Sequence, residues 1–287
     1  MSSTEVCMPV PSVGTSPSAL TERDLRNQAG WAAPAARRER DSNKLYTDPG
    51  EAAALAFVRE RIRGQPILDL GVGLGRTIPI LKPLTKDYRA IDYMAQMVKT
   101  CRERYPDARV DVGDARDLEG FPSDYFGLVQ FSFNGIDAGG AEDRRRILRG
   151  ARRVLVSGGT FLFSSLNMNG PGYRERPWRI DLPRTRNPAR FAWDIVRPLR
   201  WMPLHVINWA GLRKFEERGL GYGVSPLPAH HWTLVAHFTT LERQLEELSR
   251  EGFSNAGPVF DNKHGKPVHV GDDTTDFDWL HIVAVKV

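Results

Sequence analysis

The sequence predicts an α/β protein built on a doubly wound, mostly parallel sheet, and three observations lead to this prediction. Short apolar segments alternate with helical segments from about residue 66 to residue 166, as in parallel sheets that helices cover on both faces. The first apolar segment runs straight into a glycine-rich loop at residues 71–75. The alternation returns after residue 230, beyond a stretch that breaks it. At 287 residues, the chain is long enough for a core domain with a cap.

The N-terminal region predicts a tail and then helices. Residues 1–20 are rich in Ser, Thr and Pro and predict a flexible tail. A helical pattern follows from about Thr21 to Arg63, and Asp48-Pro49 predicts a helix start within it. The alternating segments that come next are, in order, strand Pro66–Leu70, helix Thr77–Leu84, strand Tyr88–Ile91, helix Ala95–Arg104, strand Ala108–Val112, strand Phe126–Phe133, helix Ala141–Val154 and strand Gly159–Leu166.

After Leu166 the rhythm breaks, because residues 168–229 carry many prolines and most of the tryptophans. We expect this segment to form an inserted cap, and residues 21–167 and 230–287 to form the core. The final elements are a strand-like segment at Trp232–Phe238, an amphipathic helix at Thr240–Glu251 ending at Gly252, and two closing strands at Phe253–Val259 and Trp279–Val287.

Composition excludes several classes of protein. Two cysteines provide neither a disulfide framework nor a cluster of metal ligands. No apolar run reaches the roughly 20 residues that a membrane span needs. The N-terminus has no basic start and no continuous apolar stretch, so it does not resemble a secretory signal, and we expect a cytoplasmic protein. The net charge of +5 is concentrated in residues 171–220, which hold 11 Lys and Arg against 5 Asp and Glu.

The glycine-rich loop indicates a ligand site. From Ile67 to Thr77 the sequence has an apolar strand, then Asp-x-Gly-x-Gly-x-Gly, then the start of a helix. Glycines at 71, 73 and 75 allow a tight turn and leave room for a ligand against the main chain. Their spacing differs from the Gly-x-Gly-x-x-Gly pattern that places a pyrophosphate on a helix N-terminus. A tight strand-to-helix turn without any ligand is the alternative.

Acidic residues follow the next two strands. Asp92 ends the second strand, where a carboxylate can accept hydrogen bonds from both ribose hydroxyls. Asp114 follows the third strand, where a carboxylate and a backbone amide can contact an adenine edge. Each residue taken alone fits a helix cap or a solvated loop equally well. Together with the glycine loop, they lie at the carboxyl ends of consecutive strands, where ligands of open α/β sheets bind.

These motifs resemble those of the class I S-adenosylmethionine-dependent methyltransferases, from roughly Asp48 to Leu166 and again from Trp232 to the end. ILDLGVGLGRT is similar to the family's first motif, AIDYM to its second-strand acidic motif, and VGDARDL to its adenine-side motif. RRVLVSGGTFLFSS resembles the fifth-strand entry, although Ser157 stands where proline is usual. The resemblance implies a Rossmann-like, mostly parallel seven-stranded sheet with an antiparallel last strand, and S-adenosylmethionine as the cofactor.

The resemblance also implies roles for individual residues. Asp69, Gly71, Gly73 and Gly75 would surround the methionine part of the cofactor, and Asp92 would hold the ribose. Tyr93 and Met94 would lie beside the adenine, which Asp114 and Ala115 would contact. Phe131 and the residues up to Asn134 would lie beneath the sulfonium. Tyr46 is a candidate to close over the cofactor, with ordinary packing as the alternative.

Methyl transfer from a sulfonium needs positioning, desolvation and, for some acceptors, removal of a proton. His230 and His231 are the candidate bases, because histidine titrates near neutrality; an exposed or core-packed pair is the alternative. Asn134 and Asp137 follow the fourth strand, where this family often places substrate-facing groups. Asn134 is the candidate to contact cofactor or substrate, with a loop-capping role as the alternative.

The cap interleaves aromatic residues with arginines, which predicts an apolar pocket that attracts an anionic group. A lid with a solvated arginine face is the alternative. We therefore expect methyl transfer to a nitrogen or oxygen of a small molecule, with an anionic compound or a specialised metabolite as the expected class. The rival functions are an RNA methyltransferase that uses the Arg/Trp-rich insert, a protein that rests on an anionic membrane surface, and a non-enzymatic cofactor-binding scaffold. Prolines between Pro183 and Pro203 argue against the membrane, because they are expected to interrupt any long amphipathic helix.

Overall fold

The computed structural model describes residues 20–33, 47–180, 185–254 and 257–287. The predicted tail (except residue 20) and the candidate Tyr46 lie outside the described residues, as do Cys7 and Arg184.

The main sheet confirms the predicted fold class. In the described part of the chain it has nine strands in the order β11-β10-β12-β5-β4-β1-β2-β3, with β9 also beside β12. Strands β1 to β5 are parallel, whereas β12 runs antiparallel to β5 and β10 antiparallel to β12. The strands are β1 Ile67–Leu70, β2 Tyr88–Asp92, β3 Arg109–Val112, β4 Phe126–Phe131, β5 Leu155–Leu166, β9 Phe253–Ser254, β10 Val259–Asp261, β11 Pro267–Val268 and β12 Trp279–Lys286.

The count exceeds the expected seven strands because the predicted closing strand at residues 253–259 is divided into β9 and β10, and because β11 adds a short pairing to β10. The succession of strands and helices along the chain otherwise follows the alternation predicted from the sequence. The sheet is therefore the Rossmann-like arrangement of parallel strands with antiparallel strands at the C-terminal end.

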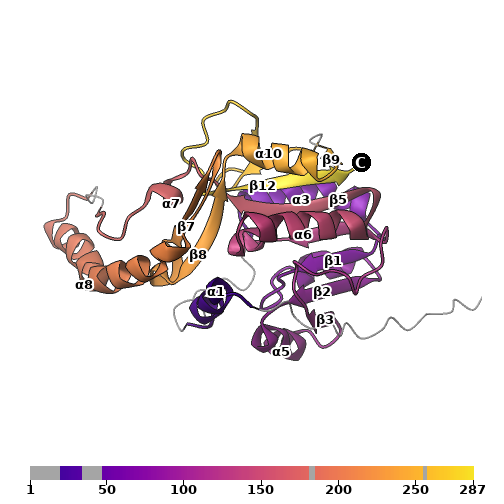
Figure 1. The fold of residues 1–287 in the computed structure, drawn as a ribbon, viewed down its shortest axis with the longest axis horizontal. Coiled ribbons are helices and arrows are strands. Elements are labelled where there is room, and N and C mark those ends of the chain that lie inside the picture. The colour runs from indigo at the N-terminus through magenta and orange to yellow at the C-terminus, as the bar shows by residue number, and fades with distance from the viewer. Residues whose placement is uncertain (1–19, 34–46, 181–184, 255–256) are drawn as a thin grey trace, which may run out of the picture.

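Helices cover both faces of this sheet. One apolar cluster packs α6 and α10 against the sheet, and a second cluster packs α3, α4 and α5 against the other face; Figure 1 shows α6 and α10 on the near side. Helix α3 begins where Asp48-Pro49 predicts, since the Asp48 side chain accepts a hydrogen bond from the Glu51 amide. The helices of this layer are α3 Pro49–Ile62, α4 Ile78–Leu81 with the 3₁₀ turn η1 Lys82–Leu84, α5 Ala95–Arg104, α6 Ala141–Val154 and α10 Leu241–Arg250, and the 3₁₀ turn η2 Gly135–Ala138 follows β4.

A second, smaller sheet follows the core and has the order β6-β7-β8, with β6 Glu217–Gly219, β7 Tyr222–Leu227 and β8 Leu234–Thr239. The sequence assigns Trp232–Phe238 to the core, but β8 pairs with β7 along its whole length and has no ladder to the main sheet in the described residues. All six residues of β8 are buried. An apolar strand buried on both faces carries no alternation that distinguishes one sheet from another, so its partner is decided by tertiary packing.

The long helix α8 of the insert extends away from the main sheet (Figure 1). Helix α8, Pro188–Leu212, is 25 residues long and contains Pro198 and Pro203. The expectation that prolines interrupt any long helix here is therefore wrong. Each proline removes one backbone donor, but an exposed helix leaves the freed carbonyl oxygens within reach of water. The shorter helices are α7 Pro171–Arg174, the 3₁₀ turn η3 Arg213–Phe215 and α9 Ala229–Trp232.

Helix α1, Glu22–Ala32, packs against strand β8 of the small sheet. Thr21 caps it, and the side chain of Asp24 accepts a hydrogen bond from the Thr21 amide in return. The side chain of Asn27 joins α1 to β8: its amide nitrogen donates to the Val235 carbonyl oxygen at 2.9 Å, and its oxygen accepts from the Val235 amide at 2.9 Å. A polar side chain thus completes the backbone pairing at the edge of β8.

Candidate active site

A cavity of about 500 Å³ lies at the carboxyl ends of the parallel strands. Loops after β1, β2, β3 and β4 form one wall, and α1, α9 and β8 form the other. Most of the predicted site residues line it, namely Gly71, Gly73, Asp92, Tyr93, Met94, Asp114, Ala115, Phe131, Asn134 and His230. The structure brings them together because the carboxyl ends of parallel strands meet at one sheet edge.

The glycine loop exposes its backbone to the cavity at Gly73. This residue has φ of +56°, and a Cβ added to it would have no neighbour within 4 Å. The Gly73 amide donates to Asp92 Oδ2 at 2.9 Å, and the Met94 amide donates to Asp92 Oδ1 at 2.8 Å. The loop after β1 is therefore tied to the end of β2, with open space above the glycine where a ligand can approach the main chain.

Asp69 does not line the cavity, so the structure does not place it against a methionine moiety. Its carboxylate is buried beneath the loop and accepts hydrogen bonds from the hydroxyls of Thr77 and Tyr88. Burial raises the pKa of Asp69 to about 6, although those two hydroxyls oppose the rise. Its position makes it an anchor of the strand-to-helix turn.

Gly75 is also absent from the cavity wall. A Cβ at this position would lie 2.5 Å from the ring of Tyr105 and 2.9 Å from the sulfur of Cys101. The third glycine of the motif is thus required by the packing of the end of α5 against the loop.

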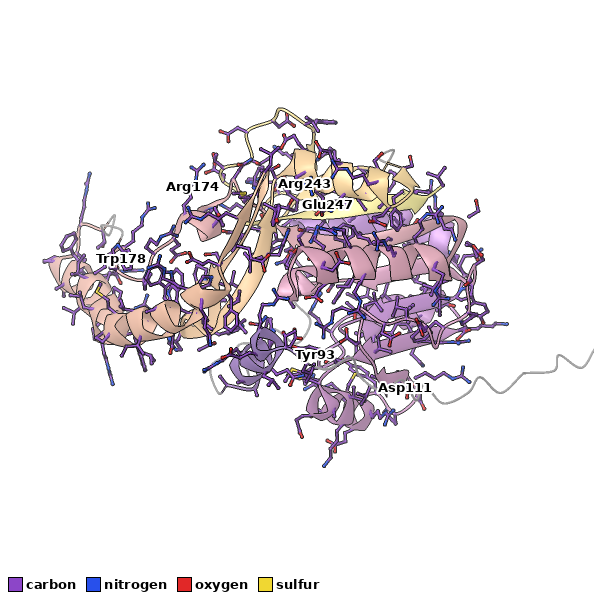
Figure 2. All side chains as sticks on the ribbon, in the orientation of Figure 1. Tyr93, Asp111, Arg174, Trp178, Arg243 and Glu247 are labelled. Carbon is purple, nitrogen blue, oxygen red and sulfur yellow. The ribbon has the colours of Figure 1, made fainter. Side chains whose placement is uncertain are left out.

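Asp114 lines the cavity, but its carboxylate is held by Arg116. The Arg116 Nη2 atom lies 2.7 Å from Asp114 Oδ2, and Nη1 lies 3.0 Å from Asp24 Oδ2 on α1. Arg116 therefore joins the loop after β3 to the helix that closes the cavity. Figure 2 places Tyr93 at this junction, beside α1.

Helix α1 contributes three lining residues that the sequence motifs do not indicate: Asp24, Asn27 and Trp31. The Thr21-x-x-Asp24 pattern signals a helix start but carries no indication of a site. Because α1 reaches the cavity through contacts with β8 and Arg116, more than 90 residues away in sequence, only the folded chain reveals its part in the wall.

The two candidate histidines point to different places. His230 lines the cavity, and its ring meets the ring of Trp31 edge-on at 5.2 Å. His231 faces α8 instead, where its Nδ1 lies 2.9 Å from His205 Nε2 and its carbonyl oxygen accepts a hydrogen bond from the side-chain Nδ2 of Asn208. Of the two candidate bases, His230 lies at the cavity and His231 does not, so a catalytic role remains a prediction for His230 only.

The backbone around these histidines is strained. His230, His231 and Trp232 have φ values of +52°, +62° and +63°. For residues other than glycine, this left-handed conformation costs about 1–3 kcal/mol each. Phe133 and Asn134 on the opposite wall share it, with φ of +51° and +58°. Strain of this kind persists only where the surrounding packing enforces it, and it concentrates here at two walls of the cavity.

Asn134 presents an unsatisfied acceptor at the site. Its backbone amide donates to Ser164 Oγ at 2.8 Å, which fixes the loop after β4 on β5. Its side-chain Oδ1 is buried and has no hydrogen-bond partner among the described residues. A buried carbonyl oxygen without a partner costs about 1–3 kcal/mol, and a bound N–H or O–H group would remove that cost.

Asp137 serves the fold beneath this loop. Its carboxylate accepts hydrogen bonds from the Leu166 amide at 2.7 Å, from Ser165 and from the fully buried Arg144. Burial raises the pKa of Asp137 to about 7, and the Arg144 charge opposes that rise. Arg144 also contacts Glu247 and Gln244 on α10, so this cluster joins η2, β5, α6 and α10 below the cavity.

His237 on β8 borders the same cluster and makes the stability depend on pH. Its ring is fully buried, and neither ring nitrogen has a hydrogen-bond partner in the part of the chain described. Burial, together with the charges of Arg144, Arg23 and Arg243, lowers the pKa of His237 well below its ordinary value, even though Asp137 lies 4.0 Å away. Above pH 6.5 the ring is neutral in both states, so the group contributes no pH dependence there.

Below about pH 6.5 the unfolded chain takes up a proton that folded His237 refuses, so stability falls as the pH falls. We expect this group to cost the protein about 2 kcal/mol at pH 5 relative to pH 7.5. Urea unfolding at both pH values should show that His237→Phe, which keeps the stacking on Tyr222, removes this loss. His269→Phe is the control, because that side chain is 79% exposed. Equal pH dependence in the wild type and His237→Phe would contradict the assignment.

The arginines of the insert that the structure describes do not line the cavity. The insert and the loop before β12 instead contribute two carboxylates to the cavity lining, Glu175 and Asp278. The arginines that do line it, Arg76, Arg104 and Arg116, belong to the core. Arg76 is held by Glu51 through two contacts of 2.7 and 2.8 Å and lies over the ring of Phe133. The sequence predicts that arginines of the insert attract an anionic substrate into the cavity. None of the described arginines of the insert is placed to do so.

The geometry fits an adenosyl sulfonium. Bare backbone at Gly73 leaves space against the main chain, and Asp92 lies at the end of β2 with 6% of its surface exposed. Aromatic side chains of Tyr93 and Phe131 border the same cavity. No phosphate-binding helix N-terminus of the Gly-x-Gly-x-x-Gly type is needed for such a ligand.

Comparisons with known proteins agree with this geometry. Residues 68–163 match the model of a methyltransferase domain. No curated protein matches the chain. Among solved structures, an S-adenosylmethionine-dependent methyltransferase from Mesorhizobium loti is 19% identical, with a TM-score of 0.53, and the alignment covers 83% of this chain and 98% of that one.

Two further structures are similar in fold. The 1,6-didemethyltoxoflavin-N1-methyltransferase of Burkholderia thailandensis, solved with 1,6-didemethyltoxoflavin and S-adenosylhomocysteine, is 10% identical with a TM-score of 0.58, covering 94% of this chain and 92% of that one. The glycopeptide N-methyltransferase MtfA, solved with S-adenosylmethionine, is 18% identical with a TM-score of 0.50, covering 84% and 96%. The domain match over residues 68–163, the strand order and the site at the carboxyl edge of the sheet together agree with the fold of S-adenosylmethionine-dependent methyltransferases.

Proposed function

We propose that this enzyme methylates a nitrogen of a small, largely apolar amine, which enters the cavity from the side of the insert. The observation that carries the proposal is Asn134, a residue of the cavity lining whose buried Oδ1 atom lacks a partner among the described residues. Such an atom selects for a ligand group that carries a hydrogen, such as N–H.

The charges of the cavity support an amine over an acid. Glu175 and Asp278 line the cavity, and a carboxylate attracts an ammonium group and repels an anion. The Asn167 amide donates to the Asp278 carbonyl oxygen at 2.9 Å, which fixes the backbone of Asp278 at the rim. By their names, two of the similar enzymes are N-methyltransferases, which agrees with nitrogen as the acceptor.

The residues have distinct roles in this proposal. S-adenosylmethionine supplies a methyl group already activated by its positive sulfur. Gly73, Asp92, Tyr93 and Ala115 hold the cofactor, Asn134 orients the acceptor, and His230 takes up the proton that the acceptor nitrogen loses. A volume of about 500 Å³ is in the range of pockets for small ligands.

Transfer of a radiolabelled methyl group from S-adenosylmethionine to a panel of small amines, phenols, carboxylic acids and unfractionated tRNA tests the proposal. We expect label on amines. Asp278→Asn should raise the KM for an amine acceptor about 10-fold or more, as expected for loss of a charge-assisted hydrogen bond.

Cofactor affinity should stay unchanged in that variant, because the proposal assigns Asp278 to the acceptor and not to the cofactor. Asp276→Asn is the matched control, since Asp276 is exposed and does not line the cavity. Label on tRNA or on acids without label on amines would refute the proposal and, in the case of tRNA, would favour the rival RNA methyltransferase.

A further inference from the structure

Most residues of helix α8 are exposed, although the helix is rich in large apolar residues. Leu212 alone among its 25 residues is buried. Its most exposed apolar side chains are Ile207 at 68% and Trp193 at 63%. The large apolar residues that it exposes are Phe191, Trp193, Val196, Leu199, Trp201, Leu204 and Ile207. A concentration of this kind on one element marks an interaction surface, because single exposed apolar residues are ordinary and clusters are not.

Four of these residues share one face of the helix. Trp193, Val196, Leu204 and Ile207 are spaced by 3, 8 and 3 residues, which brings them into one line along an α-helix. We call these four residues the arm stripe. The protein uses a different face of α8, where His205 and Asn208 contact α9 and Trp209 meets Trp178 at 5.0 Å. Figure 2 shows Trp178 beside α8 at the end of the molecule far from the main sheet.

Basic residues accompany the arm stripe. Arg190, Arg197 and Arg200 are exposed on α8, and Asp194 is its single carboxylate. Exposed arginines at 174, 179 and 186 precede the helix. The surface that α8 fits must therefore combine an apolar interior with negative charge at its boundary.

An anionic bilayer has both properties. In a symmetric pairing of two copies, the arginines of one α8 would meet the arginines of the other. Single-stranded RNA supplies negative charge, but the aliphatic side chains of Val196, Leu204 and Ile207 offer no ring for bases to stack on. Acyl chains accept such side chains, while tryptophan and arginine favour the boundary with the headgroups.

We propose that α8 binds the surface of membranes that contain anionic lipids, with the arm stripe buried at the boundary of the acyl chains and the arginines at the phosphates. This goes beyond the methyl transfer proposed above and does not depend on the acceptor. No helix in the described ranges has both the length and the apolar character to cross a bilayer, so the contact is peripheral. Because α9 carries His230 at the cavity and His231 against α8, the bound helix lies next to one wall of the site.

Co-sedimentation of the full chain with vesicles tests this. Vesicles of phosphatidylcholine with about a third phosphatidylglycerol should bind the protein, and pure phosphatidylcholine should bind it far more weakly. Trp193→Gln/Ile207→Gln should lower binding to the anionic vesicles at least 10-fold. Arg197→Glu/Arg200→Glu should lower it about 30-fold or more, since each basic residue near an anionic surface contributes roughly a 5-fold change.

Matched control variants distinguish the effect of the arm stripe and the α8 arginines from the effect of general surface hydrophobicity and charge. Leu220→Gln/Val270→Gln removes two apolar side chains that are 92% and 58% exposed outside α8, and it should bind like the wild type. Arg59→Glu/Arg61→Glu makes the same change in net charge on the exposed side of α3. It should lower binding much less than Arg197→Glu/Arg200→Glu does. Unaltered cofactor affinity and unfolding temperature show that each variant is folded.

Three results would overturn the proposal. The first is equal binding to neutral and anionic vesicles, or none to either. The second is vesicle binding that the two α8 variants and their control variants reduce equally. The third is a partner of another class: a dimer that Trp193→Gln/Ile207→Gln dissociates, or tRNA bound in a gel-shift assay through the same residues, with no binding to lipid.

Discussion

Replacing Gly73 by valine is expected to abolish measurable binding of S-adenosylmethionine while leaving the protein folded. A side chain at this position would meet no protein atom within 4 Å, so it would project into the cavity space that the cofactor needs. Isothermal titration calorimetry should show a loss of affinity of at least 100-fold. The variant also carries backbone strain of about 1–2 kcal/mol, because Gly73 has φ of +56°.

Gly158→Val is the matched control for that strain. Gly158 has φ of +73°, has open space around its Cβ direction, and does not line the cavity. Both variants should lose similar amounts of thermal stability, and Gly158→Val should bind the cofactor normally. A folded Gly73→Val protein with unchanged cofactor affinity would remove the glycine loop from the binding site.

Replacing Arg144 by methionine should strongly destabilise the fold. Arg144 is fully buried and contacts Asp137, Gln244 and Glu247. Its removal leaves two buried carboxylates without this cation, a change that costs about 3–5 kcal/mol. Urea denaturation at pH 7.5 measures the effect on the free energy of unfolding.

The neighbouring Arg145 supplies the control. Its side chain is 45% exposed and pairs with Glu142 one turn away, so Arg145→Met should change stability by at most about 1 kcal/mol. Adding Asp137→Asn to Arg144→Met should restore part of the loss, because one stranded charge is then neutral. If Arg144→Met is as stable as Arg145→Met, the cluster under η2 does not hold α6 and α10 together.

Much of the architecture follows from local patterns. The alternation of apolar strands and helices, the Asp48-Pro49 helix start and the glycine loop each depend on residues close together in sequence. The carboxyl ends of β1, β2 and β3 must converge because parallel strands share an edge, so the meeting of Gly73, Asp92 and Asp114 in one cavity is predictable. Their roles in binding remain predictions.

Other features depend on side-chain direction. Asp69 and Asp92 both lie near the ends of core strands, yet Asp69 lies beneath the turn and Asp92 at the cavity. Successive residues in a strand face opposite sides of the sheet. The elements packed on each face then decide which of these side chains reaches the ligand. Neighbouring His230 and His231 likewise separate, because the left-handed backbone at α9 turns one toward the cavity and the other toward α8.

The sequence by itself determined the class of fold, the alternation of its core strands and helices, and the edge of the sheet where the predicted site residues meet, because periodicity, turn residues and strand direction are local properties. Tertiary structure alone decided that α1 closes the cavity, that β8 joins the small sheet, that the carboxylates of Glu175 and Asp278 and not the described arginines of the insert line the cavity, and that α8 continues through its prolines. Each of these depends on contacts between residues far apart in the chain, and such contacts leave no periodic signal in the residues that make them.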